Sequence, residues 1–284
     1  MKINACIIGV QKGGTSSLYN WLSQHPQIEA PNHFKDFPYF SEEKYFGKGF
    51  NSLESSYKDS NSIKLMGHVH YIFFKDSLQR LHDYNPKLKL ILVLRDPVER
   101  LWSSYQYAIQ KGLEQDVLRD AIDKENLRLE GTVLEKRELT YFAHSKYLDQ
   151  IKSLFDVFDR GQVKILLFED LTENPQEQTK EIFEFLNVTE DFLPNFKHVN
   201  KTGKPLSKSL NRFIQKGGGV KSLLKVIPLK YRTQIRKWII SINQTDSVKT
   251  KIEPQINESL YTEFSKDNSE IQNLIQKDLS KWHK

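Results

Sequence analysis

Residues 3–25 read INACIIGVQKGGTSSLYNWLSQH, and this stretch decides the fold. Its first part, residues 5–8, is short, apolar and partly β-branched, which is typical of a buried strand. Further on, Leu18 and Leu22 recur at helical spacing. Between these two patterns, Gly13 and Gly14 allow close approach of the backbone. Successive N–H groups there, with the positive end of the helix behind them, can hold a phosphate. The stretch therefore predicts a strand, a phosphate-binding turn and a helix.

The position of the lysine separates this loop from the loop of nucleoside-triphosphate-binding proteins, G-x-x-x-x-G-K-[ST]. Gly9, Gly14 and Ser16 match that motif, but Thr15 occupies its lysine position. Lys12 lies inside the loop instead, where its flexible point charge would reach the atom that bridges the phosphate and the transferred group. A tight turn with a solvated lysine is the alternative interpretation, because short motifs also match by chance.

The segment GVQKGGTSSL, residues 9–18, resembles the 5′-phosphosulfate loop of the sulfotransferases that use 3′-phosphoadenylyl sulfate (PAPS). The similarity is to the glycan-modifying and related bacterial branches in particular. It rests on a lysine before the glycine pair, T-S after the pair, and a following helix with L-x-x-x-L. The resemblance implies that Lys12 contacts the oxygen that bridges phosphate and sulfonate. The residues that would then bind the 5′-phosphate are Gly13, Gly14, Thr15 and Ser16.

A second block of the same family resemblance follows the most apolar run of the chain. Residues 88–94, LKLILVL, predict a buried parallel strand. The block LRDPVERLWSSY, residues 94–105, is similar to the family's 3′-phosphate site, R-[DN]-P-x-x-R-x-x-S-x-[YW], which implies that Arg95 and Ser103 bind that phosphate. Arg95 follows the strand at the edge where open α/β sheets bind ligands, and its planar fork suits a phosphate. A helix cap or a pair with Asp96 would explain Arg95 but not the whole block.

Two stretches hold candidates for the base that takes the acceptor's proton. Residues 25–40, HPQIEAPNHFKDFPYF, predict a loop over the site, and Asp36 stands where the glycan-modifying sulfotransferases carry the acid of a K-E pair. Residues 64–74, KLMGHVHYIFF, predict a strand that places His68 and His70 on one face. Histidine has an ordinary pKa near 6.5, which suits general-base work at neutral pH. This favours His70, with His68 as its substitute. The alternative for Asp36 is an exposed charge pair with Lys35. The alternative for His68 and His70 is a hydrogen-bonded pair that packs under the loop.

A basic stretch follows the last predicted core elements. Residues 196–210, FKHVNKTGKPLSKSL, contain Gly and Pro and predict a loop that holds an anion. The stretch resembles the sulfotransferase loop that closes over the adenine and the 3′-phosphate, although a solvated basic loop is an ordinary alternative. The resemblance assigns donor binding to Lys201, Thr202, Gly203 and Lys204.

Bulk properties limit the class of protein. The 284 residues are 38% hydrophobic and include 17 Phe, 12 Tyr and 4 Trp, which suits a globular protein. The net charge of +6 favours anionic partners. The single cysteine, Cys6, cannot form an intramolecular disulfide and is compatible with a reducing compartment. The sequence begins without an export signal and has no run near the ~20 apolar residues of a membrane span, so we expect a cytoplasmic location.

The expected fold is α/β, a P-loop-like three-layer sandwich with a central parallel β-sheet flanked by helices. The resemblance extends over residues 1–284 as one domain, with a PAPS-binding core at about 1–25, 64–110 and 160–210 and a helical part at 210–284. The expected function is transfer of sulfonate from PAPS to a hydroxyl or amine of a saccharide or glycoconjugate, without a metal and without a nucleic-acid partner. The alternatives are a P-loop kinase, which also needs Mg²⁺, and a non-catalytic nucleotide- or nucleic-acid-binding module.

Overall fold

The computed structural model describes residues 2–58, 61–196, 204–205, 244–245 and 251–282. The chain divides into two compact units. The first, called the sheet unit below, comprises residues 1–100, 144–200 and 261–284, and the second comprises residues 101–143 and 201–260. The candidate site residues that can be placed together all belong to the sheet unit.

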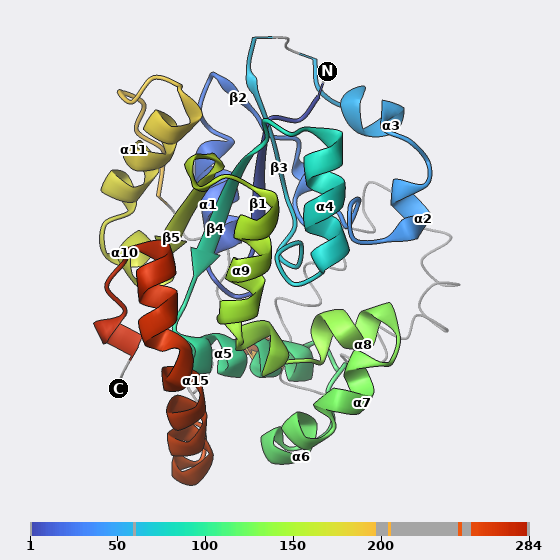
Figure 1. Ribbon diagram of the computed structural model, residues 1–284, viewed down its shortest axis with the longest axis vertical. Helices are drawn as coiled ribbons and strands as arrows, with labels where there is room; N and C mark the ends of the chain where they lie inside the picture. The colour runs from blue at the N-terminus through green and yellow to red at the C-terminus, as the bar shows by residue number, and fades with distance from the viewer. Residues whose placement is uncertain (1, 59–60, 197–203, 206–243, 246–250, 283–284) are drawn as a thin grey trace. The chain divides into compact units, whose positions relative to one another are not determined.

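The sheet unit is built on five parallel strands in the order β2-β3-β1-β4-β5 (Figure 1). Ile7 of the central strand pairs with Gly67 on one side and with Ile91 on the other. Because parallel neighbours need crossover connections, helices must cover both faces of such a sheet. The strands are β1 (Ala5–Gly9), β2 (Ile28–Glu29), β3 (Ile63–Gly67), β4 (Lys89–Leu94) and β5 (Val163–Leu167).

Successive residues of the strands pack into two separate hydrophobic cores, one on each face of the sheet. Cys6 and Leu92 pack with α4 (Lys75–Tyr84) and α9 (Tyr147–Val157) on one face. On the other face, the apolar residues of β1 and β4 pack with α1 and α11, which are the Thr15–Leu22 and Pro175–Leu186 helices (Figure 1). Side chains point to opposite faces in turn along a strand, so apolar residues in a row require both layers. The predicted three-layer α/β architecture is confirmed.

The remaining elements are short, apart from two long helices that pass from one unit into the other. The sheet unit also holds α2 (Glu43–Phe46), α3 (Asn51–Glu54), α10 (Phe168–Glu173) and four 3₁₀ turns at Asn32–Phe34, Ala143–Ser145, Arg160–Gln162 and Ser280–Trp282, the second of which begins at the last residue of the second unit. The two long helices are α5 (Pro97–Gln110) and α15 (Pro254–Ile275). The second unit holds α6 (Leu118–Asp123), α7 (Glu125–Leu129), α8 (Val133–Glu138) and the antiparallel pair β6 (Lys204–Pro205) and β7 (Gln244–Thr245).

The strand predicted over residues 64–74 is wrong beyond Gly67, where β3 ends. The N–H of His68 still donates to the Ile7 carbonyl at 2.9 Å, but the chain then turns over residues 69–73. Within that turn, the Phe73 N–H donates to the His70 carbonyl at 3.1 Å. The turn packs Tyr71 and Ile72 into the core beside the strands. The apolar character of the run therefore reflects tertiary burial and not an extended backbone.

Candidate functional site

The candidate phosphate loop connects the end of β1 to the start of α1. The Val10 N–H donates to the Val93 carbonyl at 3.0 Å, and the Gly13 N–H donates back to the Val10 carbonyl at 3.0 Å. A Cβ at Gly13 would lie 2.8 Å from the Val93 oxygen, so a larger residue does not fit this turn. Gly14 has φ +83°, a conformation that favours glycine. The predicted strand, turn and helix are confirmed.

The start of α1 has the electrostatic character that an anion site needs. Its first turn contains no acidic residue, and its N-cap residue is Gly14, which has no side chain to cap the N–H groups. The first N–H groups of a helix have no partners inside the helix and carry a partial positive charge. Thr15 is buried at this end, and Ser16 next to it is partly exposed. These two residues and the loop N–H groups fit a phosphate.

Lys12 and Asp36 share an uncommon backbone conformation. Their φ angles are 69° and 64°, and only Asn187 and Gln276 join them as non-glycine residues with positive φ in the described chain. A side chain in the left-handed region has a steric cost, so it persists where the surroundings hold it. Residues of this kind cluster at functional sites, and the observation supports the two candidates that the sequence predicts.

Arg95 lies directly after β4 and reaches the phosphate loop. Its Nη1 donates to the Lys12 carbonyl oxygen at 3.3 Å, and the guanidinium lies 4.7 Å from the centre of the Phe168 ring. Glu99, in the first turn of α5, places its carboxylate 3.3 Å from Nη2. The Arg95 carbonyl accepts a hydrogen bond from the Tyr147 hydroxyl at 2.9 Å. The sheet edge thus brings the Arg95 guanidinium, on a side chain that is 18% exposed, to the loop, which is the position that the sequence predicts.

Asp36 is held beside the end of β3. Its backbone N–H donates to the Gly67 carbonyl at 2.7 Å, and the preceding Lys35 pairs with Gly67 as an isolated parallel bridge. The Asp36 carboxylate forms an ion pair with the Lys35 ammonium at 2.6 Å and is 48% exposed. The loop therefore presents a solvent-accessible carboxylate near the carboxyl edge of the sheet.

His68 and His70 lie in a buried cluster that includes a third histidine. Their ring centres are 5.4 Å apart, and the ring of His144 is 5.0 Å from that of His70. His144 also stacks on Phe73 at 3.7 Å. His68 and His70 are each 2% exposed. Sequence reasoning missed His144, because it follows the histidine pair by more than 70 residues and belongs to no motif.

Asp96 follows Arg95 and lies directly before the first residue of α5. Its Oδ1 accepts from the Glu99 N–H at 2.9 Å and so caps α5, while the Tyr261 hydroxyl lies 3.3 Å from Oδ2. Burial, with the nearby carboxylates of Glu99 and Glu169, raises the pKa of Asp96 to about 6. A raised carboxyl pKa is common at functional sites, but here the contacts are those of a helix cap.

Several predicted site residues cannot be placed relative to the phosphate loop and Arg95. Lys201, Thr202 and Gly203 are outside the described residues, and only the backbone pairing of Lys204 with Thr245 is described. Ser103 lies on α5 but belongs to the second unit. Its role beside Arg95 stays a prediction.

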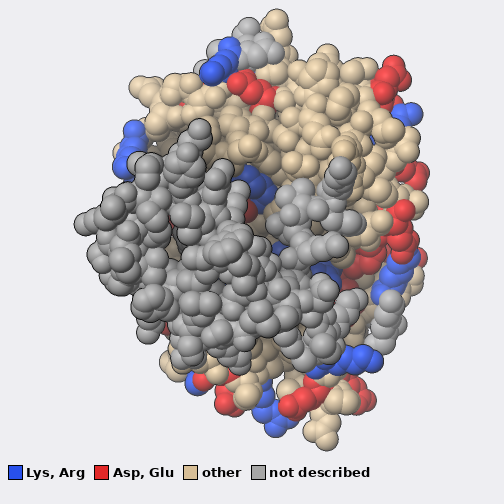
Figure 2. All heavy atoms as spheres, turned by 180° about the vertical axis from the view of Figure 1, so that it is seen from behind, with Lys and Arg blue, Asp and Glu red and all other residues tan. Residues whose placement is uncertain are grey.

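Among the described residues, no group of three or more histidine, cysteine, aspartate and glutamate side chains is arranged to hold a metal ion. No described helix is both long and apolar enough to cross a membrane. Figure 2 shows basic and acidic side chains interspersed over the described part of one face.

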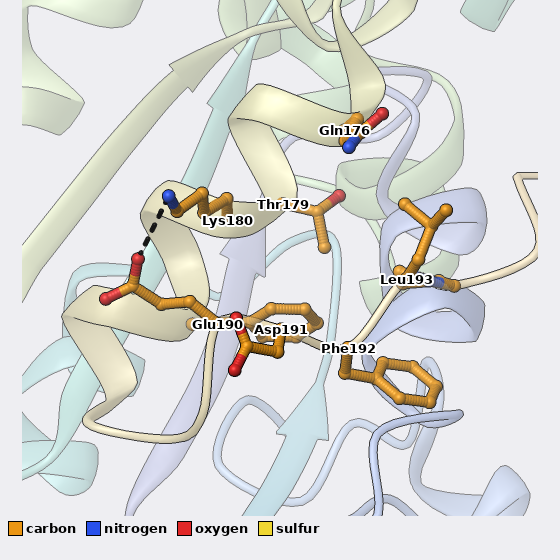
Figure 3. A pocket seen from close by; sticks show the side chains of 9 residues that line it. Gln176, Thr179, Lys180, Glu190, Asp191, Phe192 and Leu193 are labelled. Carbon is orange, nitrogen blue, oxygen red and sulfur yellow. Dashed lines mark ion pairs between the residues drawn. The ribbon is translucent and has the colours of Figure 1, made fainter.

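A small pocket of about 70 Å³ lies between α11 and residues 190–194 (Figure 3). Lys180 and Glu190 form an ion pair of 3.4 Å beside it, and the Phe192 ring contributes to its lining. No residue of the phosphate loop lines this pocket, so it is separate from the candidate donor site.

The chain is similar to several known proteins. The model of the family described as "Sulfotransferase domain" matches residues 2–258. Membrane-associated sulfotransferase kil1 of Dictyostelium discoideum is 37% identical over 112 residues, which cover 38% of this chain and 23% of the relative. Heparan sulfate glucosamine 3-O-sulfotransferase 3B1 of Mus musculus is 24% identical over 204 residues, 70% of this chain and 49% of the relative. The chain thus spans half or less of the length of these relatives.

One solved structure resembles the chain over its whole length. The crystal structure of a sulfotransferase from Alicyclobacillus acidocaldarius has a TM-score of 0.74 and 24% sequence identity, with all of both chains covered. At this identity the likeness shows a shared fold.

Proposed function

The chain belongs to the sulfotransferase domain family, and from this premise we propose that it transfers a sulfonate group from PAPS to a hydroxyl or amine of a saccharide or glycoconjugate. The observation that carries the proposal is the contact between the Arg95 guanidinium and the Lys12 carbonyl, 3.3 Å apart. It joins the candidate phosphate loop to the arginine for which we propose 3′-phosphate binding, within one unit. A donor with a 5′-phosphosulfate and a 3′-phosphate needs two such anion sites side by side.

The proposed roles follow from what each group can do. The loop N–H groups, Thr15 and Ser16 would hold the 5′-phosphate, and Arg95 with Ser103 would hold the 3′-phosphate. In the transfer, an acceptor oxygen or nitrogen bonds to sulfur while the bond from sulfur to the bridging phosphate oxygen breaks. Lys12 would stabilise the negative charge that the leaving phosphate gains. Such a reaction depends on positioning and electrostatic stabilisation.

The acceptor's proton must pass to a base within about 2.6–3.2 Å, or through one water. The 48% exposure of the Asp36 carboxylate lets an acceptor reach it, whereas His70 is 2% exposed within its cluster. The structure thus favours Asp36 for direct contact, although the ordinary pKa of histidine favours His70. We propose Asp36 as the first candidate, with His70 and then His68 as rivals.

We propose a donor-binding role for residues 201–204 from the family resemblance of their sequence, and the segment that precedes them packs against the end of α1. His25, beyond the end of α1, bonds the Thr189 carbonyl at 2.9 Å, and Gln24 accepts from the Asn195 N–H at 2.9 Å. Phe196 then packs edge-on against Trp21, at 5.1 Å. The described residues 189–196 therefore pack along the C-terminal end of α1.

The saccharide acceptor is proposed from the names of relatives such as the heparan sulfate 3-O-sulfotransferase and from the net charge of +6. The P-loop kinase is not favoured, because Thr15 occupies the position of its lysine. The test is incubation of the protein with PAPS and panels of saccharides, phenols and peptides, with mass spectrometry for a gain of about 80 daltons per transferred sulfonate. A gain confined to phenols or peptides would contradict the saccharide assignment, and no gain with any acceptor would contradict the activity.

A further inference from the structure

Phe168, the first residue of α10, touches both parts of the proposed donor site. A Cβ built on Gly14 would lie 2.9 Å from Cδ2 and 3.1 Å from Cε2 of its ring, so the ring lies directly against the phosphate loop. The Arg95 guanidinium carbon lies 4.7 Å from the centre of the same ring. One aromatic side chain therefore contacts the glycine that starts the α1 helix and the arginine proposed to bind the 3′-phosphate.

These contacts restrict the position of the Arg95 side chain. The guanidinium is held between the Phe168 ring and the Lys12 carbonyl, which lies 3.3 Å from Nη1. The Glu99 carboxylate, 3.3 Å from Nη2, is the group that a bound phosphate would displace. A guanidinium stacks well on an aromatic face, because it is planar and weakly hydrated. An arginine held in place before the ligand arrives loses less side-chain freedom on binding.

We infer that Phe168 is a positioning residue that sets the preference of the donor site for nucleotides with a 3′-phosphate. It acts through Arg95, and the inference requires no contact between the Phe168 ring and the nucleotide. The inference rests on the proposed function, because it assumes that Arg95 binds the 3′-phosphate. It adds that the ring holds Arg95 against the loop that binds the 5′-phosphate.

The experiment is calorimetric titration of the full chain with 3′,5′-ADP and with 5′-AMP. Phe168→Leu keeps an apolar side chain against Gly14 and removes the aromatic face. We expect it to raise the Kd for 3′,5′-ADP about three- to tenfold and to change the Kd for 5′-AMP less than about twofold. Phe168→Tyr keeps the face and should retain most of the affinity for 3′,5′-ADP.

A matched control is Phe185→Leu. Phe185 is also a partly buried ring on the same core, and it lies 5.3 Å from the ammonium of another cation, Lys89. Its loss should leave both nucleotide affinities unchanged. If Phe168→Leu does not fold, judged by thermal unfolding, Phe168→Met serves as the ring-free variant, because its unbranched side chain adapts to irregular space.

A double-mutant cycle separates positioning from support of the loop. If the ring acts through Arg95, the variant Arg95→Ala with Phe168→Leu should bind 3′,5′-ADP no more weakly than Arg95→Ala alone. Additive losses, or equal losses for both nucleotides in Phe168→Leu, would overturn the inference.

The same titrations distinguish this inference from the proposed function. Arg95→Ala should by itself remove the preference for 3′,5′-ADP over 5′-AMP. If it does so while Phe168→Leu keeps the full preference, only the role of Phe168 is wrong. If Arg95→Ala keeps the preference, the proposed 3′-phosphate site is wrong, and the role of Phe168 falls with it.

Discussion

Lys12 combines a charged side chain with a left-handed backbone, and the two properties predict different mutant effects. Lys12→Ala should lower kcat about 10²- to 10³-fold, because the charge that stabilises the leaving phosphate is lost. The Kd for 3′,5′-ADP should change much less, because that product lacks the sulfonate. Lys12→Gly should be equally inactive but unfold at the same or a higher temperature than Lys12→Ala, because glycine adopts the φ of 69° without strain. Equal losses of kcat and of 3′,5′-ADP affinity would contradict the assignment.

The competition between Asp36 and His70 for the role of base is decided by a pair of variants. Asp36→Asn keeps the size of the side chain and removes its basicity, so it should lower kcat about 10²- to 10⁴-fold if Asp36 takes the proton. His70→Ala should then lose far less. Both should bind 3′,5′-ADP like the wild type, which is the control for an intact donor site. Near-complete loss in His70→Ala with an active Asp36→Asn would reverse the assignment, and full activity in both would place the base elsewhere.

If Arg95 binds the 3′-phosphate as proposed, the Glu99 carboxylate competes with that phosphate for the guanidinium. This carboxylate lies 3.3 Å from Arg95 Nη2 and is itself more than half exposed, so the pair contributes little to stability. A 3′-phosphate that binds Arg95 must approach this negative charge. Glu99→Gln should therefore lower the Kd for 3′,5′-ADP about two- to fivefold and leave that for 5′-AMP unchanged, by titration at low salt. A weaker binding of 3′,5′-ADP would mean that Glu99 orients Arg95 productively.

At the scale of elements, the N-terminus of α5 predicts a dependence of stability on pH. The pKa of Asp96 is about 6 in the folded protein against 3.8 for an ordinary aspartate, chiefly because of burial. Between these two values the folded state binds more protons than the unfolded state, so this group lowers the free energy of unfolding as pH rises from about 4 to 6. Above about pH 6 the loss is complete and amounts to roughly 1–3 kcal/mol.

Asp96→Asn isolates this contribution, because the amide oxygen can still accept from the Glu99 N–H. We expect the variant to be more stable than the wild type at pH 7.5, and the difference to shrink as the pH falls to 4. Urea unfolding at a series of pH values measures it. A variant less stable than the wild type at every pH would show that the charge of the cap outweighs its burial.

The contrast between β4 and β3 shows which elements can be predicted from sequence. Residues 88–94 are apolar, are followed by Arg95-Asp96-Pro97, and form a strand whose neighbours lie on both sides. Residues 64–74 are equally strand-like, but their second half turns, because Tyr71 and Ile72 pack into the core. In both stretches the run of apolar residues indicates burial. Only tertiary packing decides whether a buried run is extended.

At the scale of the whole molecule, one part of the candidate site can likewise be predicted from local sequence and another part cannot. Lys12, Arg95 and the loop glycines follow from motifs, because a turn between strand and helix and the end of a parallel strand meet at one sheet edge. The contact of Phe168 with both Gly14 and Arg95, and the packing of His144 on His70, join residues far apart in the chain. No spacing of residues within a short stretch predicts these contacts, so only the structure shows them.

The charge of the whole chain yields the last prediction. Residues 197–250 contain 13 of the 42 lysines and arginines and one acidic residue, Asp246, so the positive balance of the sequence comes from this stretch. A concentration of charge attracts anionic ligands in a way that salt screens. With PAPS saturating, KM for an anionic saccharide should rise several-fold between about 50 and 300 mM NaCl, while KM for a neutral acceptor of the same backbone changes less than about twofold. Because donor binding is saturated, the difference reports the acceptor alone. An equal rise for both acceptors would show that the charge of the chain plays no part in acceptor choice.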